Sequence, residues 1–279
     1  MNETILEVKK LSVTFTQYDR GFSRRTLHAV EEMNLSIHSK EIVAVVGSSG
    51  SGKSLLAHAI MGILPYNGDM SGEILFCGEP LTTEHVKKLR GHEIVLVPQS
   101  VSYLDPVMKI GDQIRNGKKS ASIKERCLSV LKRYGLSPDI TEKYPFQLSG
   151  GMTRRVLIST AVMEQPKLVI ADEPTPGLHL EAATRVMGHF REMADEGAGV
   201  LLITHDLELA LLTADRVIVL YGGRVIEETD AESFQDEKNL KHPYTKALYR
   251  SMPKNWNNGG TELCDTGNIL DEMRKEYGR

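Results

Sequence analysis

The sequence predicts an α/β fold, in which a mostly parallel β-sheet is flanked by helices. Short apolar segments alternate with helical patterns over much of the chain, which is typical of such a sheet. Each apolar segment is followed at once by glycine-rich or polar residues, the pattern expected where parallel strands end. The predicted strands are residues 42–46, 94–97, 167–171 and 199–203. Two further features complete the prediction: a β layer at the N-terminus and an inserted helical block.

The N-terminal layer is predicted from residues 4–15 and 27–36, which have strand-like patterns on either side of a polar, Arg-rich loop at 17–25. We expect both strands to pair with the strand at 42–46 as an antiparallel layer. An aromatic ring here could stack on a purine. Phe15 is the first candidate and Tyr18 the second, and the alternative is an ordinary core or surface aromatic.

The remaining elements follow in order. Residues 73–77 form a short strand, and the pattern from about 110 to 165 is helical, with Gly135 ending one helix. This block interrupts the alternation, so we predict an inserted helical subdomain at about 105–165. Alternation resumes with helices at 180–196 and 206–215 and a hairpin at 216–227 that turns at two glycines. The predicted domain is therefore 1–253, followed by a C-terminal tail at 254–279.

Composition excludes several classes of protein. The 279 residues carry a net charge of −3, which argues against nucleic acid as a partner. The cysteines at 77, 127 and 264 form no C-x-x-C pair, so neither a disulfide framework nor a thiolate metal site is expected. No apolar run reaches the roughly 20 residues of a membrane-spanning helix, and we expect no signal peptide.

A phosphate-binding loop is predicted at residues 47–54, which read Gly-Ser-Ser-Gly-Ser-Gly-Lys-Ser. They fit the P-loop pattern G-x-x-x-x-G-K-[ST] and lie between a buried strand and a helical pattern. The glycines let successive N–H groups point into one concavity. Lys53 can then reach the β- and γ-phosphates, and Ser54 can hold Mg²⁺. The residues predicted to bind ATP are Phe15, Gly47, Ser48, Ser49, Gly50, Ser51, Gly52, Lys53, Ser54 and Leu55.

Polar groups suited to phosphoryl transfer follow the other strands, and we expect them to converge at one sheet edge. Asp172 is assigned to the Mg²⁺ shell through water, beside Ser54, and Glu173 to the activation of the attacking water. Gln99 would sense the γ-phosphate through Mg²⁺ or water, and His205 would contact the γ-phosphate and hold Glu173. Taken singly, each could instead be a helix cap or a surface turn.

A second glycine cluster, Ser149, Gly150 and Gly151, opens another helical run and forms another potential nest of N–H groups. One chain cannot easily wrap two such nests around a single nucleotide. We therefore predict a head-to-tail dimer, in which each cluster faces the P-loop of the other subunit.

The set of motifs, in this order and spacing, resembles the ATPase subunit of ABC transporters over residues 4–230. The resemblance implies that Ser149, Gly150 and Gly151 bind ATP in trans, that ATP closes the dimer and that hydrolysis reopens it. It also implies two transmembrane permease subunits, an extracytoplasmic solute-binding protein that acts indirectly, and a peripheral position at the cytoplasmic face of the membrane.

Two segments narrow the range of possible cargoes. Residues 97–111 and 242–253 resemble the corresponding segments of the dipeptide, oligopeptide and nickel importer group. Residues 62–65 and 144–152 are similar to nickel-importer ATPases, and Cys264 stands alone where peptide importers often carry several cysteines. The resemblance therefore favours nickel or a metal chelate as cargo, with di- or oligopeptides as the alternative.

One departure from the family concerns His179, which stands where the family usually has Asp and where the two sites of the dimer communicate. Since this group usually pairs two similar ATPase subunits, we expect a heterodimer with unequal sites, and a homodimer is the alternative. A permease helix is expected in the groove lined by Val101, Tyr103, Leu104 and Val107, unless these side chains pack internally.

Other classes fit less well. A DNA-repair ATPase of the same superfamily needs a long coiled-coil insertion, and no heptad run occurs between 54 and 149. A translation factor with tandem cassettes needs a second P-loop. Within transport, Tyr103–Pro106 and His242–Tyr244 favour import over export.

Overall fold

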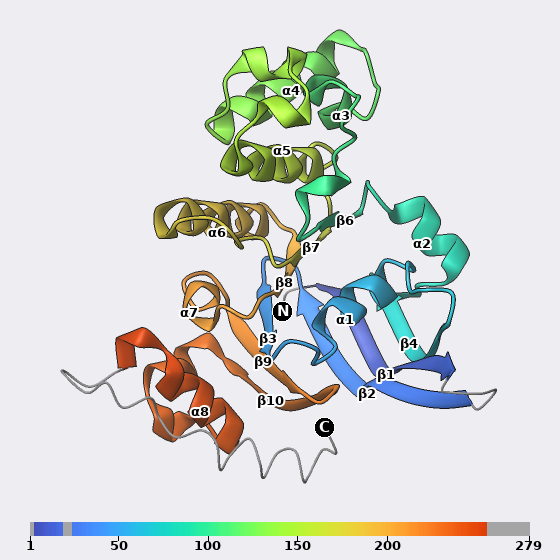
Figure 1. Ribbon diagram of the computed structural model, residues 1–279, viewed down its shortest axis with the longest axis vertical. Coiled ribbons are helices and arrows are strands. Elements are labelled where there is room, and N and C mark those ends of the chain that lie inside the picture. Colours follow the sequence, from blue (N-terminus) through green and yellow to red (C-terminus); the bar gives the residue numbers. More distant parts are fainter. Residues whose placement is uncertain (1–2, 19–23, 256–279) are drawn as a thin grey trace.

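The computed structural model, which describes residues 3–18 and 24–255, confirms an α/β fold built on two β-sheets (Figure 1). The larger sheet has the strand order β10-β9-β3-β8-β7-β6 and is parallel except for its β9–β10 hairpin. Its strands are β3 (Ile42–Gly47), β6 (Ile94–Val97), β7 (Leu168–Asp172), β8 (Gly199–Ile203), β9 (Arg216–Tyr221) and β10 (Arg224–Asp230). The four strands predicted to be parallel are therefore adjacent.

The smaller sheet is antiparallel, with the order β2-β1-β4-β5. Its strands are β1 (Thr4–Tyr18), β2 (Arg24–His38), β4 (Gly68–Phe76) and β5 (Glu79–Pro80). The predicted pairing of the first two strands with residues 42–46 is wrong, because they pair with each other and with β4 instead. Both also extend into the predicted Arg-rich loop, where Tyr18 pairs with Arg24. Polar residues are tolerated there because one face of an antiparallel sheet can meet water.

The hydrophobic core lies on both faces of the larger sheet. Val43 and Val45 pack with helix α1 (Lys53–Ile60) and the smaller sheet, whereas Ala44 and Val46 pack on the opposite face. Side chains point alternately to the two faces of a strand, so a doubly covered strand reads as one continuous apolar run. The opposite face is covered by helices α6 (Leu180–Asp195), α7 (Leu207–Ala210) and α8 (Pro243–Ser251).

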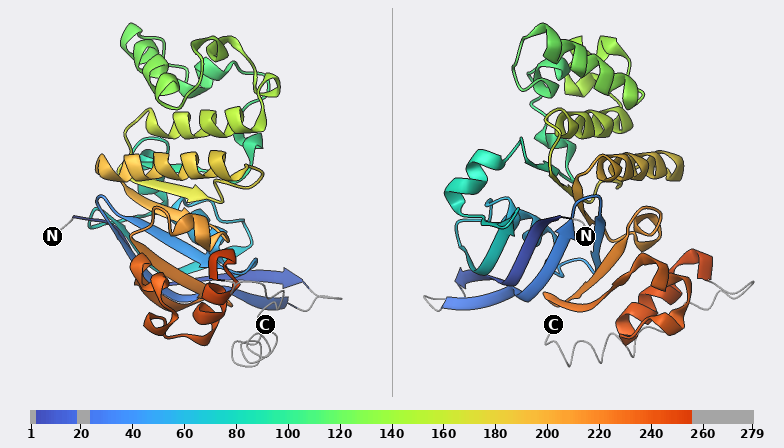
Figure 2. Two further views of the ribbon diagram at one scale, coloured as in Figure 1. Left: turned by 90° about the vertical axis from the view of Figure 1, so that its left-hand side faces the viewer. Right: turned by 180° about the vertical axis from the view of Figure 1, so that it is seen from behind.

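The helical block between β6 and β7 stands beyond the end of the sheet (Figures 1 and 2). Its helices α3 (Ile110–Ile114), α4 (Ala121–Arg133) and α5 (Gly150–Val162) enclose a hydrophobic cluster of their own, which includes Ile114, Cys127 and Leu131. Gly135 ends α4 as predicted: its φ is +62°, and Leu136 N–H donates to Leu131 O at 2.8 Å. The opposite face of α5 contributes Ile158 to the core of the larger sheet, so this helix connects the helical block to that sheet.

Several elements differ from the prediction. Helix α2 (Thr83–Leu89) was not predicted, and α7 is much shorter than the expected 206–215. Short 3₁₀ turns occupy Val101–Tyr103, Pro138–Glu142, Pro145–Gln147, Ala231–Gln235, Glu237–Asn239 and Pro253–Asn255. Most of the predicted tail lies outside the described residues. No helix of the described residues is long and apolar enough to cross a membrane.

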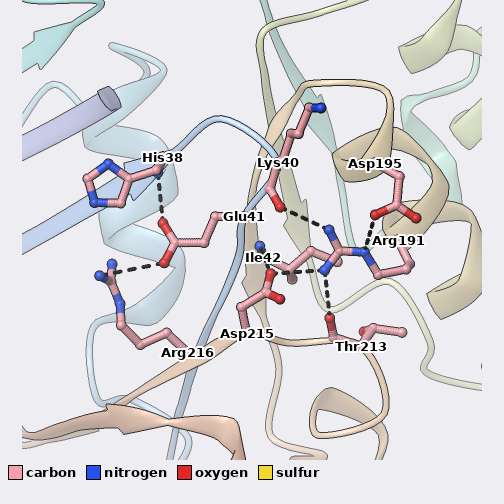
Figure 3. Close-up of polar contacts among 9 residues, drawn as sticks. All are labelled: His38, Lys40, Glu41, Ile42, Arg191, Asp195, Thr213, Asp215 and Arg216. Atoms are coloured by element: carbon pink, nitrogen blue, oxygen red, sulfur yellow. Dashed lines mark hydrogen bonds and ion pairs between the residues drawn. The ribbon is translucent and has the colours of Figure 1, made fainter. Parts of the chain in front are cut away.

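The amino end of β3 is fixed by a polar network, which Figure 3 shows. The Asp215 carboxylate accepts a hydrogen bond from Ile42 N–H at 2.7 Å and from the Arg191 guanidinium at 2.9 Å. Arg191 also donates to Lys40 O at 2.9 Å. The network therefore ties α6 and the start of β9 to the strand that leads into the P-loop.

Candidate functional site

Of the predicted polar groups, Gln99, Glu173 and His205 line one cleft with the P-loop at the carboxyl ends of β3, β6, β7 and β8, and Asp172 adjoins it through its bond to Ser54. The cleft has a volume of about 480 Å³. Its lining consists of Ser49, Gly50, Gly52, Lys53, Ser54, Leu55, Gln99, Glu173 and His205. Segments far apart in the sequence converge there because parallel strands end at the same edge of a sheet.

The P-loop needs its glycines for two different reasons. At Gly47 the limit is space, because an added Cβ would lie 2.2 Å from Leu220 O, and φ is +154°. At Gly50 and Gly52 the limit is the backbone, since their φ values are +79° and +97° and other residues rarely adopt them. Gly52 is the N-cap of α1. The loop therefore passes from strand to helix within a few residues.

Lys53 is folded onto its own loop. Its Nζ donates to Gly47 O at 2.8 Å and to Ser48 O at 2.9 Å. Burial lowers the pKa of Lys53, and the nearby Glu173 and Asp172 carboxylates oppose that shift. The ammonium group is thus held at the mouth of the nest, where a phosphate could take the place of the two carbonyls.

A hydroxyl and a carboxylate lie side by side next to the loop. Ser54 Oγ donates to Asp172 Oδ1 at 3.1 Å. Burial raises the pKa of Asp172, the Ser54 hydrogen bond lowers it and the adjacent Glu173 raises it further. A cation would relieve this unfavourable burial of charge. Together with the amide of Gln99, these are the hard oxygen ligands that Mg²⁺ prefers.

Glu173 is held in an unusual conformation. Its φ is +46°, and its N–H donates to Ile203 O at 2.8 Å. Its Oε2 lies 2.8 Å from His205 Nδ1 and accepts from Thr204 Oγ1 at 3.4 Å. The carboxylate side chain is 11% exposed, whereas the imidazole is 67% exposed. A strained residue of this kind is typical of functional sites, and here the strain directs the carboxylate into the cleft.

The structure does not bring every predicted residue to the cleft. The ring of Phe15 packs against Gly68, where an added Cβ would lie 2.8 Å away, and Phe15 is absent from the lining. Its stacking role stays a prediction, and the side chain of Tyr18 lies outside the described residues. Gly47, Ser48 and Ser51 belong to the loop without lining the cleft.

The second glycine cluster lies at a different place. Ser149 caps α5, and its Oγ accepts from Met152 N–H at 3.4 Å. Ser149 and Gly151 line a separate pocket of about 320 Å³ together with His179 and Arg185. The P-loop and this cluster therefore do not share a site within one chain, as the head-to-tail prediction requires.

The predicted apolar groove is only partly exposed. Tyr103 is 63% and Val107 82% exposed, but Leu104 is buried in the core of the helical block. The inclusion of Leu104 was wrong, because its side chain points toward α3 to α5. Phe146 is also exposed and stacks on Tyr144, with ring centroids 5.7 Å apart. The side chain of Val101 is not described.

One residue at the site was missed. The buried guanidinium of Arg154, on α5, donates to Pro98 O at 2.8 Å and to Gln99 O at 2.7 Å. The helix that begins at the second glycine cluster is thereby bonded to the turn that carries Gln99. No local pattern could reveal this contact, because its partners are far apart in the sequence.

The fold and the cleft define a P-loop nucleotide-binding protein of the α/β class. The chain belongs to the ABC transporter family, whose model matches residues 30–176. It is an ATPase cassette of that family, which agrees with the resemblance noted in the sequence.

Three known proteins illustrate the relationship. The oligopeptide transport ATP-binding protein of Lactococcus lactis is 36% identical, over 90% of this chain and 77% of its own length. The dipeptide transport ATP-binding protein of Haemophilus influenzae is 38% identical, over 90% of this chain and 78% of its own length. A dimeric bacterial ABC transporter cassette superposes with a TM-score of 0.70 at 27% identity and covers 81% of this chain and 99% of its own. The same cassette is known in a post-hydrolysis state with ADP and Pi.

Proposed function

We propose that this chain is the ATP-hydrolysing subunit of an ABC importer for di- or oligopeptides. The observation that carries the proposal is one cleft in which the P-loop meets the Glu173–His205 pair, with Asp172 hydrogen-bonded to Ser54 beside it. Family membership and the peptide-transport names of the relatives support it.

The binding step follows from the loop. The N–H groups of residues 48–54 bind the phosphates of ATP, with the N-terminus of α1 behind them. Lys53 exchanges its bonds to Gly47 O and Ser48 O for phosphate oxygens. Ser54, Asp172 and Gln99 would hold Mg²⁺, directly or through water. The ion would neutralise part of the phosphate charge.

Hydrolysis follows from the Glu173–His205 pair. Glu173 accepts a proton from a water molecule. The oxygen of that water bonds to the γ-phosphorus, while the bond between the γ-phosphorus and the oxygen that bridges it to the β-phosphate breaks. His205 donates a hydrogen bond that orients the carboxylate, and its exposed ring edge is free to meet the γ-phosphate. Lys53 stays beside the charge that develops on the leaving group.

Completion of the site requires a second subunit. Ser149, Gly150 and Gly151 bind the γ-phosphate of ATP held by a partner ATPase, and the partner does the same in return. The partner is a similar subunit, with an identical one as the alternative, and His179 makes the two sites unequal. One of the two permease subunits docks at the exposed Tyr103 and Val107 of this chain and the other docks on the partner ATPase, so the chain sits at the cytoplasmic face of the membrane. A solute-binding protein acts on the far side.

The preferred cargo changes from the sequence-based expectation. Nickel or a metal chelate was favoured there, with peptides as the alternative. Both curated relatives described above are named for peptide transport, and they align with 90% of this chain. We therefore place di- and oligopeptides first.

The catalytic assignment is tested by Glu173→Gln. The variant should bind ATP as the wild type does but hydrolyse it at least about 100-fold more slowly, because a general base contributes about two to four powers of ten. The exposed Glu125→Gln on α4 is the matched control and should leave both unchanged. Near-normal turnover in Glu173→Gln would remove this residue from the role. Uptake of labelled dipeptide and of nickel by a deletion strain then decides the cargo.

A further inference from the structure

The carboxylate of Glu173 is held through one of its two oxygens. Oε2 lies 2.8 Å from His205 Nδ1 and accepts from Thr204 Oγ1 at 3.4 Å. Among the described residues, no group donates a hydrogen bond to Oε1. We propose that Thr204 is a positioning residue for hydrolysis: with His205 it fixes Oε2, so that Oε1 is the oxygen that accepts the proton of the attacking water. The proposal rests on the proposed function, because it concerns the same carboxylate.

The backbone places Thr204 beside Glu173. Thr204 directly follows β8, and its N–H donates to Val45 O, on β3, at 3.2 Å. Glu173 N–H donates to Ile203 O, one residue before Thr204, at 2.8 Å. These two bonds continue the parallel pairing of β8 with β3 and β7 past the end of the strand. Thr204 therefore lies between the strand that leads into the P-loop and the carboxylate that its hydroxyl contacts.

The direction of the Thr204 hydroxyl is also fixed. Asp206 N–H donates to Thr204 Oγ1 at 3.0 Å, and the Asp206 side chain caps α7 by accepting from Leu209 N–H at 3.0 Å. A hydroxyl has one proton to donate, so the bond from Asp206 occupies a lone pair and leaves that proton for Glu173. Thr204 is 3% exposed and does not line the cleft, so solvent has little access to its hydroxyl.

A carboxylate that is bonded at one oxygen presents the other in a defined direction. The proton passes from the attacking water to Oε1, while the water oxygen bonds to the γ-phosphorus and ADP departs with the bridging oxygen. The contact between Thr204 and Oε2 is longer than the optimum of about 2.7–2.8 Å for a hydroxyl donor. Catalytic hydrogen bonds often shorten to that optimum when the substrate is bound.

The alternative role of the hydroxyl is local, because the bond from Asp206 N–H by itself stabilises the turn into α7. The two roles differ in their effect on turnover. A hydroxyl that only stabilises the turn changes the Tm, whereas a hydroxyl that positions Glu173 changes the rate of hydrolysis in folded protein.

The test is Thr204→Val in the full-length chain, because valine keeps the shape of threonine and removes the hydroxyl. We expect the kcat for ATP hydrolysis to fall about tenfold, the low end for a hydrogen bond to a charged group. The KM for ATP should stay within about twofold, because Thr204 does not line the cleft. Thr204→Ser keeps the hydroxyl and should retain the wild-type kcat within about twofold. If Thr204→Val does not fold, Thr204→Ala tests the same loss.

A double-mutant comparison shows whether Thr204 acts through Glu173. In single-turnover experiments Thr204→Val should slow hydrolysis about tenfold in the wild-type background and less than about twofold in the Glu173→Gln background. An equal slowing in both backgrounds, or an unchanged kcat in Thr204→Val, would overturn the inference and leave the proposed function intact.

The matched control is Thr245→Val on α8, which removes the hydroxyl of another buried threonine that does not line the cleft. It should leave kcat and KM within about twofold of the wild type, and an equal fall in kcat would also count against the inference. Wild-type turnover in Glu173→Gln is a different result: it would remove the proposed role of Glu173, and the inference with it.

Discussion

Replacing Arg154 by Met should uncouple α5 from the turn that carries Gln99. The guanidinium donates to Pro98 O at 2.8 Å and to Gln99 O at 2.7 Å, and the residue is 4% exposed. Met fills a similar volume and supplies no donor. The variant leaves two acceptors unpaired in or near the core, a loss of about 3 kcal/mol for hydrogen bonds from a charged group. Part of this lost free energy is regained, because Met removes a charge that is unfavourable to bury. The same burial lowers the pKa of Arg154 in the wild type. We expect a net loss of about 2 kcal/mol in the free energy of unfolding.

Two measurements check this expectation. Urea unfolding gives the free energy directly, and a loss of about 2 kcal/mol corresponds to a fall in Tm of about 5 °C for a chain of this size. ATPase turnover should fall by more than the population of folded protein explains, because Gln99 is no longer fixed relative to Ser149. Arg154→Lys keeps the positive charge but lacks the forked donors of arginine. Its free energy of unfolding and its ATPase turnover should lie between those of the wild type and Arg154→Met.

The control is Arg185→Met, which removes an exposed arginine 3.8 Å from Glu181. Exposed pairs contribute little, so the free energy of unfolding should change by less than about 0.5 kcal/mol. Wild-type stability in Arg154→Met, or an equal loss in Arg185→Met, would refute the view that the two carbonyl contacts hold the Gln99 turn.

Three further predictions concern the P-loop, the helices and the buried histidine. Lys53→Ala should lose most of the affinity for ATP, measured by titration with a fluorescent analogue; unchanged affinity would contradict the phosphate cradle. Gly188→Ala should raise the free energy of unfolding by about 0.5–1 kcal/mol, because this glycine lies in a helix with open space around it. Gly177→Ala should lower it by about 1 kcal/mol, because φ at Gly177 is +76°. The reverse order in urea unfolding would contradict the backbone argument. Burial lowers the pKa of His189, with Glu192 opposing the shift, so folding disfavours the charged form of the ring. As the pH falls through about 6.5, the unfolded chain binds this proton more readily than the folded chain does, so stability should fall. His189→Leu should flatten this slope, and an unchanged slope would show that other groups cause it.

The predicted strands of the larger sheet were located correctly because each is covered on both faces. A doubly buried strand is one apolar run followed by polar residues, and both signals lie within a few positions. The pairing of β1 and β2 was wrong because partner choice is a long-range property. The short helix α2 was not predicted, since its seven residues are too few to show a helical repeat clearly.

The site was predictable to the same extent. The convergence of Lys53, Glu173 and His205 follows from where parallel strands end, and the structure confirms that they share one cleft. The contact of Arg154 with the Gln99 turn has no local signature, because it depends on how α5 packs against the sheet. The burial of Leu104 has the same origin, since the core it joins is formed by helices that follow it in the chain.

The position of β3 in the sheet constrains the order in which the chain folds. Its only partners among the described strands are β8 and β9, with Ile42 beside Val200 and Val43 beside Arg216. During synthesis the strand that carries the P-loop therefore has no neighbour until most of the chain has emerged. Contacts of such long sequence separation form slowly, and an unpaired apolar strand is exposed to aggregation in the meantime. Truncation before β9 should thus leave the P-loop present in the chain but without a sheet to hold it.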